Sequence, residues 1–211
     1  MAVSSIPRQT LMRLPVYLSY LKGLGAQAPA NISSAAIAAA LNLGPVQVRK
    51  DLACLPCTGR PKTGYVTTEL IRALEHFLGY DDTANAIVVG AGKLGRSLMS
   101  YSGFAHYGLN ILAAFDTDPI LVGTQCDGKP ILAMDKLVDL CSRLGVHIGI
   151  ITVPAAAAQS VCDLMVRGGI LAIWNFAPVR LSAPGDVLIH NENMASSLAV
   201  LSRHLAERFK Q

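Results

Sequence analysis

Charged residues are scarce in this sequence, at 15% of the chain, whereas hydrophobic residues make up 52%. That balance excludes an intrinsically disordered chain and supplies enough apolar side chain for a buried core. No uninterrupted apolar run reaches the about 18 residues that a transmembrane helix needs, because the longest, residues 148–158, is broken by Gly, Thr and Pro. The N-terminus lacks a basic stretch followed by an apolar core, so we expect no signal peptide and a cytoplasmic protein.

Cysteine is also too sparse for a disulfide framework. The five cysteines are an odd number at mostly long spacings, which is untypical of a secreted, disulfide-stabilised domain. We expect Cys126, Cys141 and Cys162, which lie in apolar segments, to be reduced core residues. Cys54 and Cys57 have the CxxC spacing of metal and redox sites, but no second ligand pair accompanies them, so a metal or thiol role stays open.

The charges that are present are unevenly distributed. Residues 1–80 hold eight Lys and Arg against three Asp and Glu, whereas residues 81–211 hold ten against eleven. A polar, turn-rich stretch, GYDDTAN at residues 79–85, separates the two parts. A small basic part beside a near-neutral one indicates contact with a polyanion, although an ordinary basic surface would look the same.

The basic part shows helix-turn-helix spacing. A first helix is predicted over residues 7–22, opened by Pro7, and a second over residues 35–41, capped by Ser33 or Ser34. A tight turn at residues 42–44 leads to a third helix that begins at Pro45 and ends before Pro56. A β-hairpin wing at residues 58–67 and a fourth helix at residues 69–78 complete the module. The alternative is a generic helical subdomain.

Apolar periodicity predicts which faces of these helices are buried. Spacings of three and four place one stripe of the first helix in the core, and in the third helix they direct another stripe inward. A long amide and two cations then remain on or beside the outer face of the third helix, from which they can reach bases and phosphates in a major groove. The first stripe is Leu11, Leu14, Leu18 and Leu21, the second is Val48, Leu52 and Leu55, and the outer residues are Gln47, Arg49 and Lys50.

A glycine-rich turn opens the second part of the chain. A predicted strand at residues 85–89 runs into GAGKLG at residues 90–95, and a predicted helix follows at residues 96–101. GxGxxG between a strand and a helix is typical of dinucleotide sites, because the glycines let a pyrophosphate approach the helix N-terminus. A second strand at residues 110–115 ends in Asp116, 21 residues beyond Gly95, which suits a ribose-binding acid, with Asp118 as a neighbouring alternative. A carboxylate there favours NAD(H) over NADP(H).

Strands and helices continue to alternate after this motif. Strands are predicted at residues 147–152, 170–175 and 186–190, and helices at residues 134–144 and 155–167, which predicts a doubly wound parallel sheet. Ligands bind at the carboxyl ends of such strands, where residues 152–154 and 175–178 would lie. A last helix over residues 193–209 carries Met194, Leu198, Leu201 and Leu205 on one stripe without an evident partner in its own domain, so a subunit interface is plausible.

The second part lacks the features of a dehydrogenase. Such an enzyme needs a proton donor or acceptor beside the nicotinamide. None of the five histidines lies in a recognisable catalytic motif, and about 120 residues leave no room for a separate substrate domain. Both absences favour binding without turnover. The histidines are His76, His106, His147, His190 and His204.

Seven short segments together resemble the bacterial Rex family of redox-sensing transcriptional repressors, and the resemblance covers nearly the whole chain. QVRKDL and NFAP in that order are the most specific of them. The segments are ISS at residues 32–34, QVRKDL at 47–52, GY at 64–65, the glycine motif at 90–95, YSGF at 101–104, AAFD at 113–116 with Asp118-Pro119, and NFAP at 175–178.

The resemblance implies a winged helix-turn-helix domain at residues 1–80, a Rossmann-type α/β domain at residues 81–192, and a helix at residues 193–211 that swaps onto a second subunit of a homodimer. It further implies that the dimer binds palindromic operator DNA when NADH is low and releases it when NADH binds. Genes of respiration and fermentation are the implied targets.

The motifs and the resemblance together give the candidate residues. The DNA-binding candidates are Ser33, Ser34, Gln47, Arg49, Lys50, Arg60 and Lys62. The NAD(H)-binding candidates are Gly90, Ala91, Gly92, Lys93, Leu94, Gly95, Tyr101, Phe115, Asp116, Thr117, Thr152, Val153, Pro154, Asn175, Phe176 and Ala177. Two other classes remain as alternatives, a small NAD-dependent oxidoreductase and a CoA- or nucleotide-binding module, and neither requires the basic first part.

The chain departs from the family pattern in three places. CLP at residues 54–56 replaces a usual Tyr-Phe-Gly, and RPKT at residues 60–63 replaces an Arg-Gly-rich wing. In some members an Arg of the first helix, a Tyr matching Tyr101 and an Asp opening the last helix form a state-dependent network; here Ser19 and Asn193 occupy the two charged positions. Replacing both charges leaves no unpaired buried ion, so we expect sensing to persist with a differently tuned switch.

Overall fold

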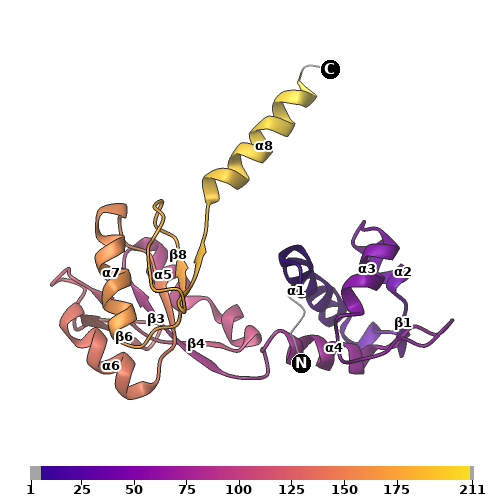
Figure 1. The fold of residues 1–211 in the computed structure, drawn as a ribbon, viewed down its shortest axis with the longest axis horizontal. Coiled ribbons are helices and arrows are strands. Elements are labelled where there is room, and N and C mark those ends of the chain that lie inside the picture. The colour runs from indigo at the N-terminus through magenta and orange to yellow at the C-terminus, as the bar shows by residue number, and fades with distance from the viewer. Residues whose placement is uncertain (1–5, 210–211) are drawn as a thin grey trace. The chain divides into compact units, whose positions relative to one another are not determined.

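The computed structural model describes residues 6–209, and these divide into two compact units between Asp82 and Thr83 (Figure 1). The division falls inside the polar stretch at residues 79–85. None of the helices in the described range is both long and apolar enough to cross a membrane. Each unit has its own hydrophobic core.

The first unit is a set of helices with a two-stranded sheet. Its buried centre combines side chains from all four α-helices, among them Leu18, Ile37, Leu52 and Leu70. Its elements are α1 (Arg8–Gly23), η1 (Gly25–Gln27), β1 (Asn31–Ile32), α2 (Ser34–Ala40), α3 (Pro45–Leu52), β2 (Tyr65–Val66) and α4 (Thr67–Phe77).

The buried face of α1 differs from the predicted stripe. Leu14, Leu18 and Leu21 are buried as expected, but Leu11 is 42% exposed, so that part of the prediction was wrong. Thr10 and Tyr17 are buried instead, because both donate hydrogen bonds to the buried carboxylate of Asp51 in α3. A polar partner on a neighbouring helix, which apolar periodicity does not register, therefore fixes the rotation of α1.

The wing forms, but its strand pairing differs from the predicted hairpin. A single antiparallel bridge joins Arg60 to Gly64 across a turn in which Lys62 has a positive φ of 66°. β2 then pairs antiparallel with β1, a strand that periodicity did not predict because it has two residues. Gly64 is required at this crossing, because it combines a φ of +82° with close approach to the backbone of Ile32.

The second unit is a seven-stranded sheet flanked by helices. The strand order is β5-β6-β4-β3-β7-β8-β9, and every neighbouring pair is parallel except β5–β6. Its elements are β3 (Ala84–Val89), α5 (Lys93–Ser100), η2 (Ser102–Tyr107), β4 (Leu109–Asp116), β5 (Gln125–Cys126), β6 (Lys129–Ala133), η3 (Met134–Lys136), α6 (Leu137–Leu144), β7 (Ile148–Ile151), α7 (Ala155–Arg167), β8 (Ala172–Asn175), β9 (Leu188–Asn191) and α8 (Met194–Arg208).

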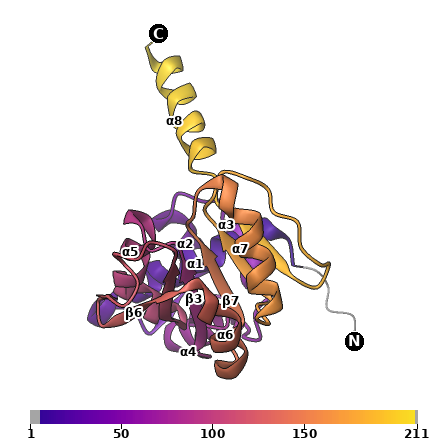
Figure 2. The same ribbon diagram turned by 90° about the vertical axis from the view of Figure 1, so that its left-hand side faces the viewer.

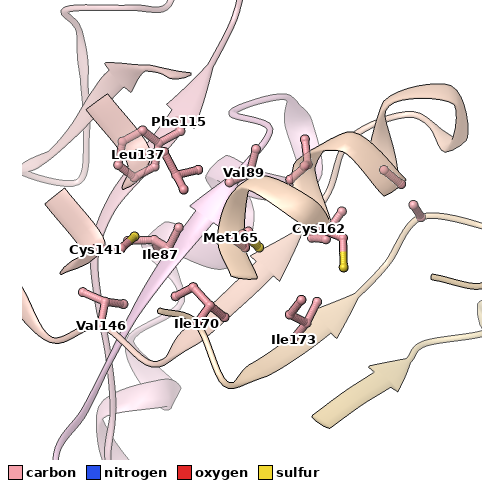
Figure 3. Close-up of a cluster of buried hydrophobic side chains, with 14 residues drawn as sticks. Ile87, Val89, Phe115, Leu137, Cys141, Val146, Cys162, Met165, Ile170 and Ile173 are labelled. Carbon is pink, nitrogen blue, oxygen red and sulfur yellow. The ribbon is translucent and has the colours of Figure 1, made fainter. Parts of the chain in front are cut away.

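Alternate residues of β3 enter cores on opposite faces of this sheet. Ile87 and Val89 pack with residues of α6 and α7, including Leu137 and Met165 (Figure 3). Ala86 and Val88 pack on the other face, with Met99 of α5. Figure 2 shows α5 and the α6–α7 pair on opposite sides of the sheet. The strand is therefore covered on both faces, which confirms the doubly wound α/β class.

The segment after β4 was not predicted from the sequence. Residues 125–133 form the β5–β6 hairpin, and β6 extends the sheet by pairing parallel with β4. Cys126 on β5 is only half-buried, so the expectation of a core position holds for Cys141 and Cys162 but not for Cys126. Gly, Pro and Asp between short apolar stretches hid these strands, because they leave too few alternating positions to read.

Helix α8 carries an apolar stripe that is exposed in the single chain. Leu198, Leu201 and Leu205 are all more than half exposed, as is the Phe209 that ends the helix. The side chain of Met194, the first residue of the predicted stripe, lies outside what the structure describes. Asn193 caps the helix, because its side-chain oxygen accepts a hydrogen bond from the backbone N–H of Ser196 at 3.0 Å.

Candidate functional site

Helix α3 presents polar side chains on one side and apolar side chains on the other. Gln47, Arg49 and Lys50 are exposed, whereas Val48 and Leu52 are completely buried. Proline at the first helical position and Gly44 before it fix where the helix starts. The helix therefore offers an amide and two cations to solvent from a base that is rigidly packed in the core.

Asp51 anchors this helix to α1 through a network of side chains. Its carboxylate accepts two hydrogen bonds from Arg13, at 2.7 Å and 2.8 Å, and one each from Thr10 at 2.9 Å and Tyr17 at 2.7 Å. Two guanidinium nitrogens reach the two carboxylate oxygens, the forked geometry that makes Arg–carboxylate pairs strong and directional. Together, the four hydrogen bonds to Asp51 hold α3 in one orientation against α1.

The ionisation of this network is set by its geometry. Burial raises the pKa of Asp51, but the hydrogen bonds from Arg13, Tyr17 and Thr10 outweigh burial and bring the pKa below its ordinary value. Burial, together with the hydrogen bond to Asp51, raises the pKa of Tyr17 to about 12. Asp51 is therefore ionised and Tyr17 neutral across the physiological pH range.

Sequence reasoning placed Asp51 in a motif but missed this role. The signal is a single acid within the inward stripe of α3, three residues after Val48 and one before Leu52. A buried carboxylate needs partners, and Arg13 and Tyr17 stand four residues apart on the first helix. That combination would have predicted the pairing.

The other candidate cations lie on the wing. Arg60 and Lys62 are exposed, and the positive φ of Lys62 places it at the tip of the turn. At the start of α2, the Ser33 side chain accepts a hydrogen bond from the Ala36 N–H at 3.0 Å, so Ser33 rather than Ser34 is the helix cap. Ser34 is the first residue of α2 and half-buried.

The glycine loop after β3 has the geometry that a phosphate cradle requires. Gly90 has a φ of +98°, and a side chain at Gly95 would overlap the carbonyl oxygen of Gly90. A Cβ at Gly92 would meet nothing within 4 Å, so the loop is open where Gly92 faces outward. These are the three requirements of the motif, a tight turn, an unobstructed approach and close helix–strand packing. α5 begins at Lys93, three residues earlier than predicted.

Asp116 at the end of β4 braces this loop. One carboxylate oxygen accepts the Ala91 N–H at 2.6 Å, and the other accepts the N–H groups of Thr117 and Asp118 at 2.7 Å and 2.9 Å. An ionised carboxylate has about four acceptor sites, so capacity remains for a hydroxyl group of a ligand. The alternative acid, Asp118, accepts the Ile120 N–H in a local turn.

A cavity of about 240 Å³ lies between the carboxyl ends of β3, β4 and β7. After β3 the chain forms β4, β5 and β6 on one side of it and then returns to form β7 on the other side; such a switch point is where open α/β sheets bind ligands. Sequence reasoning missed four residues of the wall, which are Val89, Met134, Ala157 and Val161. The predicted residues that line the cavity are Gly90, Gly92, Phe115, Asp116, Thr117, Thr152, Val153 and Pro154.

The NFAP segment lies one strand further along the same edge. Ile151 and Asn175 are paired at the ends of β7 and β8, and the Phe176 N–H donates to the Ile151 carbonyl at 2.9 Å. Asn175 is completely buried, and its amide group bonds inside its own loop to Ala177 and Val179 and, beyond it, to Asn191. Asn175 therefore shapes this loop, while Phe176 and Ala177 line a separate hollow beside it.

The remaining candidates lie along α5 or behind the loop. Ala91 is buried in the core, and Gly95 packs against Gly90. Lys93 and Leu94 are exposed in the first turn of α5, whereas Tyr101 is at the opposite end of the helix. The cavity itself does not include these residues.

The cysteines of the CxxC motif stay unassigned. Cys54 is exposed, Cys57 is half-buried, and both are free thiols. Burial raises the pKa of Cys57, which lowers its thiolate fraction at neutral pH. Within residues 6–209, no group of three or more His, Cys, Asp and Glu side chains is close enough together to hold a metal ion.

Each unit of the chain matches a known protein family. Residues 81–179 match the family described as "CoA binding domain", and residues 5–53 match the family described as "Putative DNA-binding protein N-terminus". The chain is 42% identical to the redox-sensing transcriptional repressor Rex of Bacteroides thetaiotaomicron, over 96% of this chain and 92% of that protein. It is 40% identical to the Rex repressor of Treponema denticola, over 95% of this chain and 96% of that protein.

Solved structures give the same relationship. A crystal structure of the Rex-family repressor RSP in complex with β-NAD+ and operator DNA is 34% identical, with a TM-score of 0.91 over 97% of this chain and 94% of that one. The structure of RSP in complex with β-NADH is 33% identical, with a TM-score of 0.86 over 97% and 96%.

Proposed function

This chain belongs to the Rex family of redox-sensing transcriptional repressors, and we propose that it binds palindromic operator DNA when NADH is low and releases it on binding NADH. Its targets would be genes of respiration and of fermentative NADH oxidation. The observation that carries the proposal is the presence, in one chain, of an anchored helix with exposed cations and a glycine loop braced by Asp116.

The proposed dinucleotide site is the cavity at the ends of β3, β4 and β7. The pyrophosphate would lie against the backbone at Gly92 and the N-terminus of α5, and Asp116 would accept a ribose hydroxyl. The bound dinucleotide would report the redox state of the cell, because its nicotinamide is reduced in NADH and oxidised in NAD+. The segment at residues 175–178, on the same sheet edge, is proposed for the nicotinamide end.

The proposed DNA surface is the exposed side of α3 with the wing and the start of α2. Arg49 and Lys50 would reach bases and phosphates, Gln47 would read a base edge, and Arg60 and Lys62 would contact the backbone. Ser33 and Ser34 stand at a helix N-terminus, a position that favours a phosphate. A two-fold symmetric operator requires two such surfaces, hence a dimer.

The exposed stripe of α8 is the proposed dimer contact. Leu201 is 67% exposed on a helix that would bury little apolar surface in a single chain. We expect Leu201→Glu to yield monomers, because it introduces a charge into the proposed interface, while Arg203→Glu, outside the stripe, leaves the dimer intact. Sedimentation velocity distinguishes the two results, and a monomeric wild-type chain would contradict the proposal.

The decisive experiment is an operator-binding assay on the full-length chain. DNA from upstream of its own gene is titrated with protein, first alone and then with saturating NADH or NAD+. We expect tight binding without NADH, loss of binding with NADH, and a steep decrease of DNA affinity with rising salt concentration. The slope of that decrease reports the number of phosphate contacts. Unchanged DNA affinity at saturating NADH would contradict the proposal.

The match to a CoA-binding family supports a second candidate, a CoA-binding module. Two observations favour NAD(H). CoA carries a phosphate on its ribose, which the carboxylate of Asp116 would repel, and a CoA module does not require a basic first unit. Thermal shift with NADH, NAD+ and CoA separates the two, since stabilisation by CoA alone would favour the second candidate.

We also propose that the chain acts in the cytoplasm and binds NADH without turnover. The similar proteins are named as transcriptional repressors, and the cavity wall consists mainly of apolar side chains and backbone, with Asp116 as its acidic residue. An unchanged absorbance of NADH after prolonged incubation with the protein would support binding without turnover. A loss of absorbance at about 340 nm when a carbonyl compound is added would show oxidation of NADH and favour the oxidoreductase alternative.

A further inference from the structure

We propose that Trp174 and Glu192 are positioning residues that couple the dinucleotide site to helix α8, and through α8 to the release of DNA. The proposal rests on the proposed function, because it concerns how NADH binding is transmitted. Both residues lie in the second unit, and neither was a candidate from the sequence. Four observations carry the inference.

The first observation is the position of Glu192. Its backbone N–H donates to the Asn175 carbonyl at 2.8 Å, which continues the β8–β9 ladder by one residue. The next residue, Asn193, is already the cap of α8. Glu192 therefore joins the sheet to the helix, and its side chain is placed to fix the direction in which the helix departs.

The second observation is the bond that this side chain makes. The Trp174 indole N–H donates to a Glu192 carboxylate oxygen at 2.9 Å, and His190 contacts the same oxygen at 3.1 Å. Trp174 has one donor group, and a hydrogen bond to an ionised acceptor is stronger and more directional than a neutral one. The segment entering α8 is thus attached to β8 by a specific bond.

The third observation is a continuous row of aromatic rings that leads from α5 to Trp174. The Tyr101 ring packs edge-on against Phe104 with centroids 4.9 Å apart, and Phe104 packs edge-on against Trp174 at 5.9 Å. Trp174 also contacts Phe176 at 4.9 Å. These separations lie in the range of favourable ring pairs, so displacement of one ring disturbs the next.

The fourth observation is that both ends of this row of rings belong to segments of the proposed dinucleotide site. Tyr101 ends the helix that begins at Lys93 in the glycine loop, and Phe176 belongs to the NFAP segment. Both ends of the proposed dinucleotide site therefore converge on Trp174. A Cβ at Gly103 would overlap the Tyr101 ring, so the glycine at this turn lets that ring take its place in the row.

The proposed link would be a mechanical one, in which the Trp174–Glu192 bond is either kept or broken. Movement of α5 or of the NFAP segment on ligand binding shifts the ring row, and the Trp174–Glu192 bond either follows or breaks. The stripe of α8 beyond Glu192 would move with it. Trp174 lines neither the cavity nor the hollow beside Phe176, so loss of its bond to Glu192 would change coupling without removing a ligand contact.

Two variants and a matched control test the link in the full-length chain. Trp174→Phe keeps an aromatic ring but removes the N–H donor, and Glu192→Ala removes the acceptor. Glu192→Gln keeps an oxygen acceptor at the same place and serves as the control. For each protein we measure NADH affinity, operator affinity without NADH, and the ratio of operator dissociation constants with and without saturating NADH.

We expect Trp174→Phe and Glu192→Ala to reduce this ratio by about threefold or more, with both separate affinities within about twofold of wild type. Glu192→Gln should retain the wild-type ratio. Ratios equal to wild type in both variants would overturn the inference and leave the proposed function intact. Proportional loss of NADH or DNA affinity would also overturn it, since that marks a structural role. A wild-type chain that keeps its DNA at saturating NADH would overturn the proposed function first.

Discussion

Each unit of this protein uses one carboxylate to hold its proposed functional surface, but the two carboxylates are bonded differently. Asp51 in the first unit accepts hydrogen bonds from three side chains of α1, 34 to 41 residues away in the sequence. Asp116 in the second unit accepts three backbone N–H groups, two of them from the residues that immediately follow it.

The difference reflects what each surface must do. Helix α3 has to stand in one orientation, and side chains from another helix fix orientation because they join elements that are distant in sequence. The glycine loop has to keep one backbone shape around a ligand, and backbone N–H groups fix that shape while leaving the carboxylate able to accept a further hydrogen bond. We therefore expect loss of Asp51 to affect folding, and loss of Asp116 to affect binding.

The largest expected effect is that of Asp51→Ala. Removing the carboxylate leaves the Arg13 guanidinium and the Tyr17 hydroxyl without their partner in a largely buried place, which costs about 3 kcal/mol of stability. Urea denaturation measures this, and operator affinity should fall as α3 loses its anchor. Glu69→Ala, at an exposed acid of α4, is the control. A loss no greater than that of the control would remove the contrast between the two carboxylates.

The pH dependence of this contribution has a definite sign. The pKa of Asp51 is lowered in the folded state, so its stabilising contribution is present above the ordinary carboxyl pKa and is lost as the pH falls through the lowered value. The difference in stability between wild type and Asp51→Ala should therefore shrink progressively as the pH falls below about 4. A constant difference down to pH 2 would indicate that the carboxylate is not the source.

The second expected effect is that of Asp116→Ala on ligand binding. It should weaken NADH binding by about tenfold or more, because a hydrogen bond to a charged acceptor is lost and the Ala91 N–H is released. Operator affinity without NADH should stay unchanged. Asp135→Ala, at an exposed acid of the same unit, is the control for titration calorimetry. Equal NADH affinity in both variants would show that the ribose contact lies elsewhere.

The third expected effect separates the surface of α3 from its anchor. Arg49→Ala or Lys50→Ala should each weaken operator binding by about tenfold, with no change in NADH affinity and little change in stability. If a variant loses a phosphate contact, the slope of log affinity against log salt concentration should also become shallower by about 1. Arg72→Ala, at an exposed cation of α4, is the matched control. If all three variants bind DNA alike, α3 is not the recognition helix.

The smallest expected effect concerns one partner of Asp51. Tyr17→Phe removes a single hydrogen bond while Arg13 and Thr10 remain, so we expect a loss of about 1 kcal/mol. Because the pKa of Tyr17 is raised from 10.0 to about 12, its contribution is present below pH 10 and is lost as the pH rises through 12. Difference curves between wild type and variant over that range check the assignment.

Much of the fold followed from the sequence because local patterns carried it. Ala155–Arg167 was predicted with the bounds of α7, since apolar spacing and flanking Pro154 and Gly168 mark both ends. The hairpin at residues 125–133 was missed, because two strands of two and five residues have almost no periodicity. The walls of the cavity followed from motifs, whereas Met134, Ala157 and Val161 did not, because they reach the cavity only through sheet topology.

The sequence by itself determined the class of each unit, the glycine loop, the acid after β4 and the cations of α3. All of these depend on residues close together in the chain. Only the tertiary structure decided that α1 turns Thr10 and Tyr17 rather than Leu11 toward the core, and that Trp174 bonds to Glu192. Those contacts join segments that are distant in sequence. The partner of a single acid or tryptophan cannot be predicted from its sequence neighbours, because the partner comes close only when the chain folds.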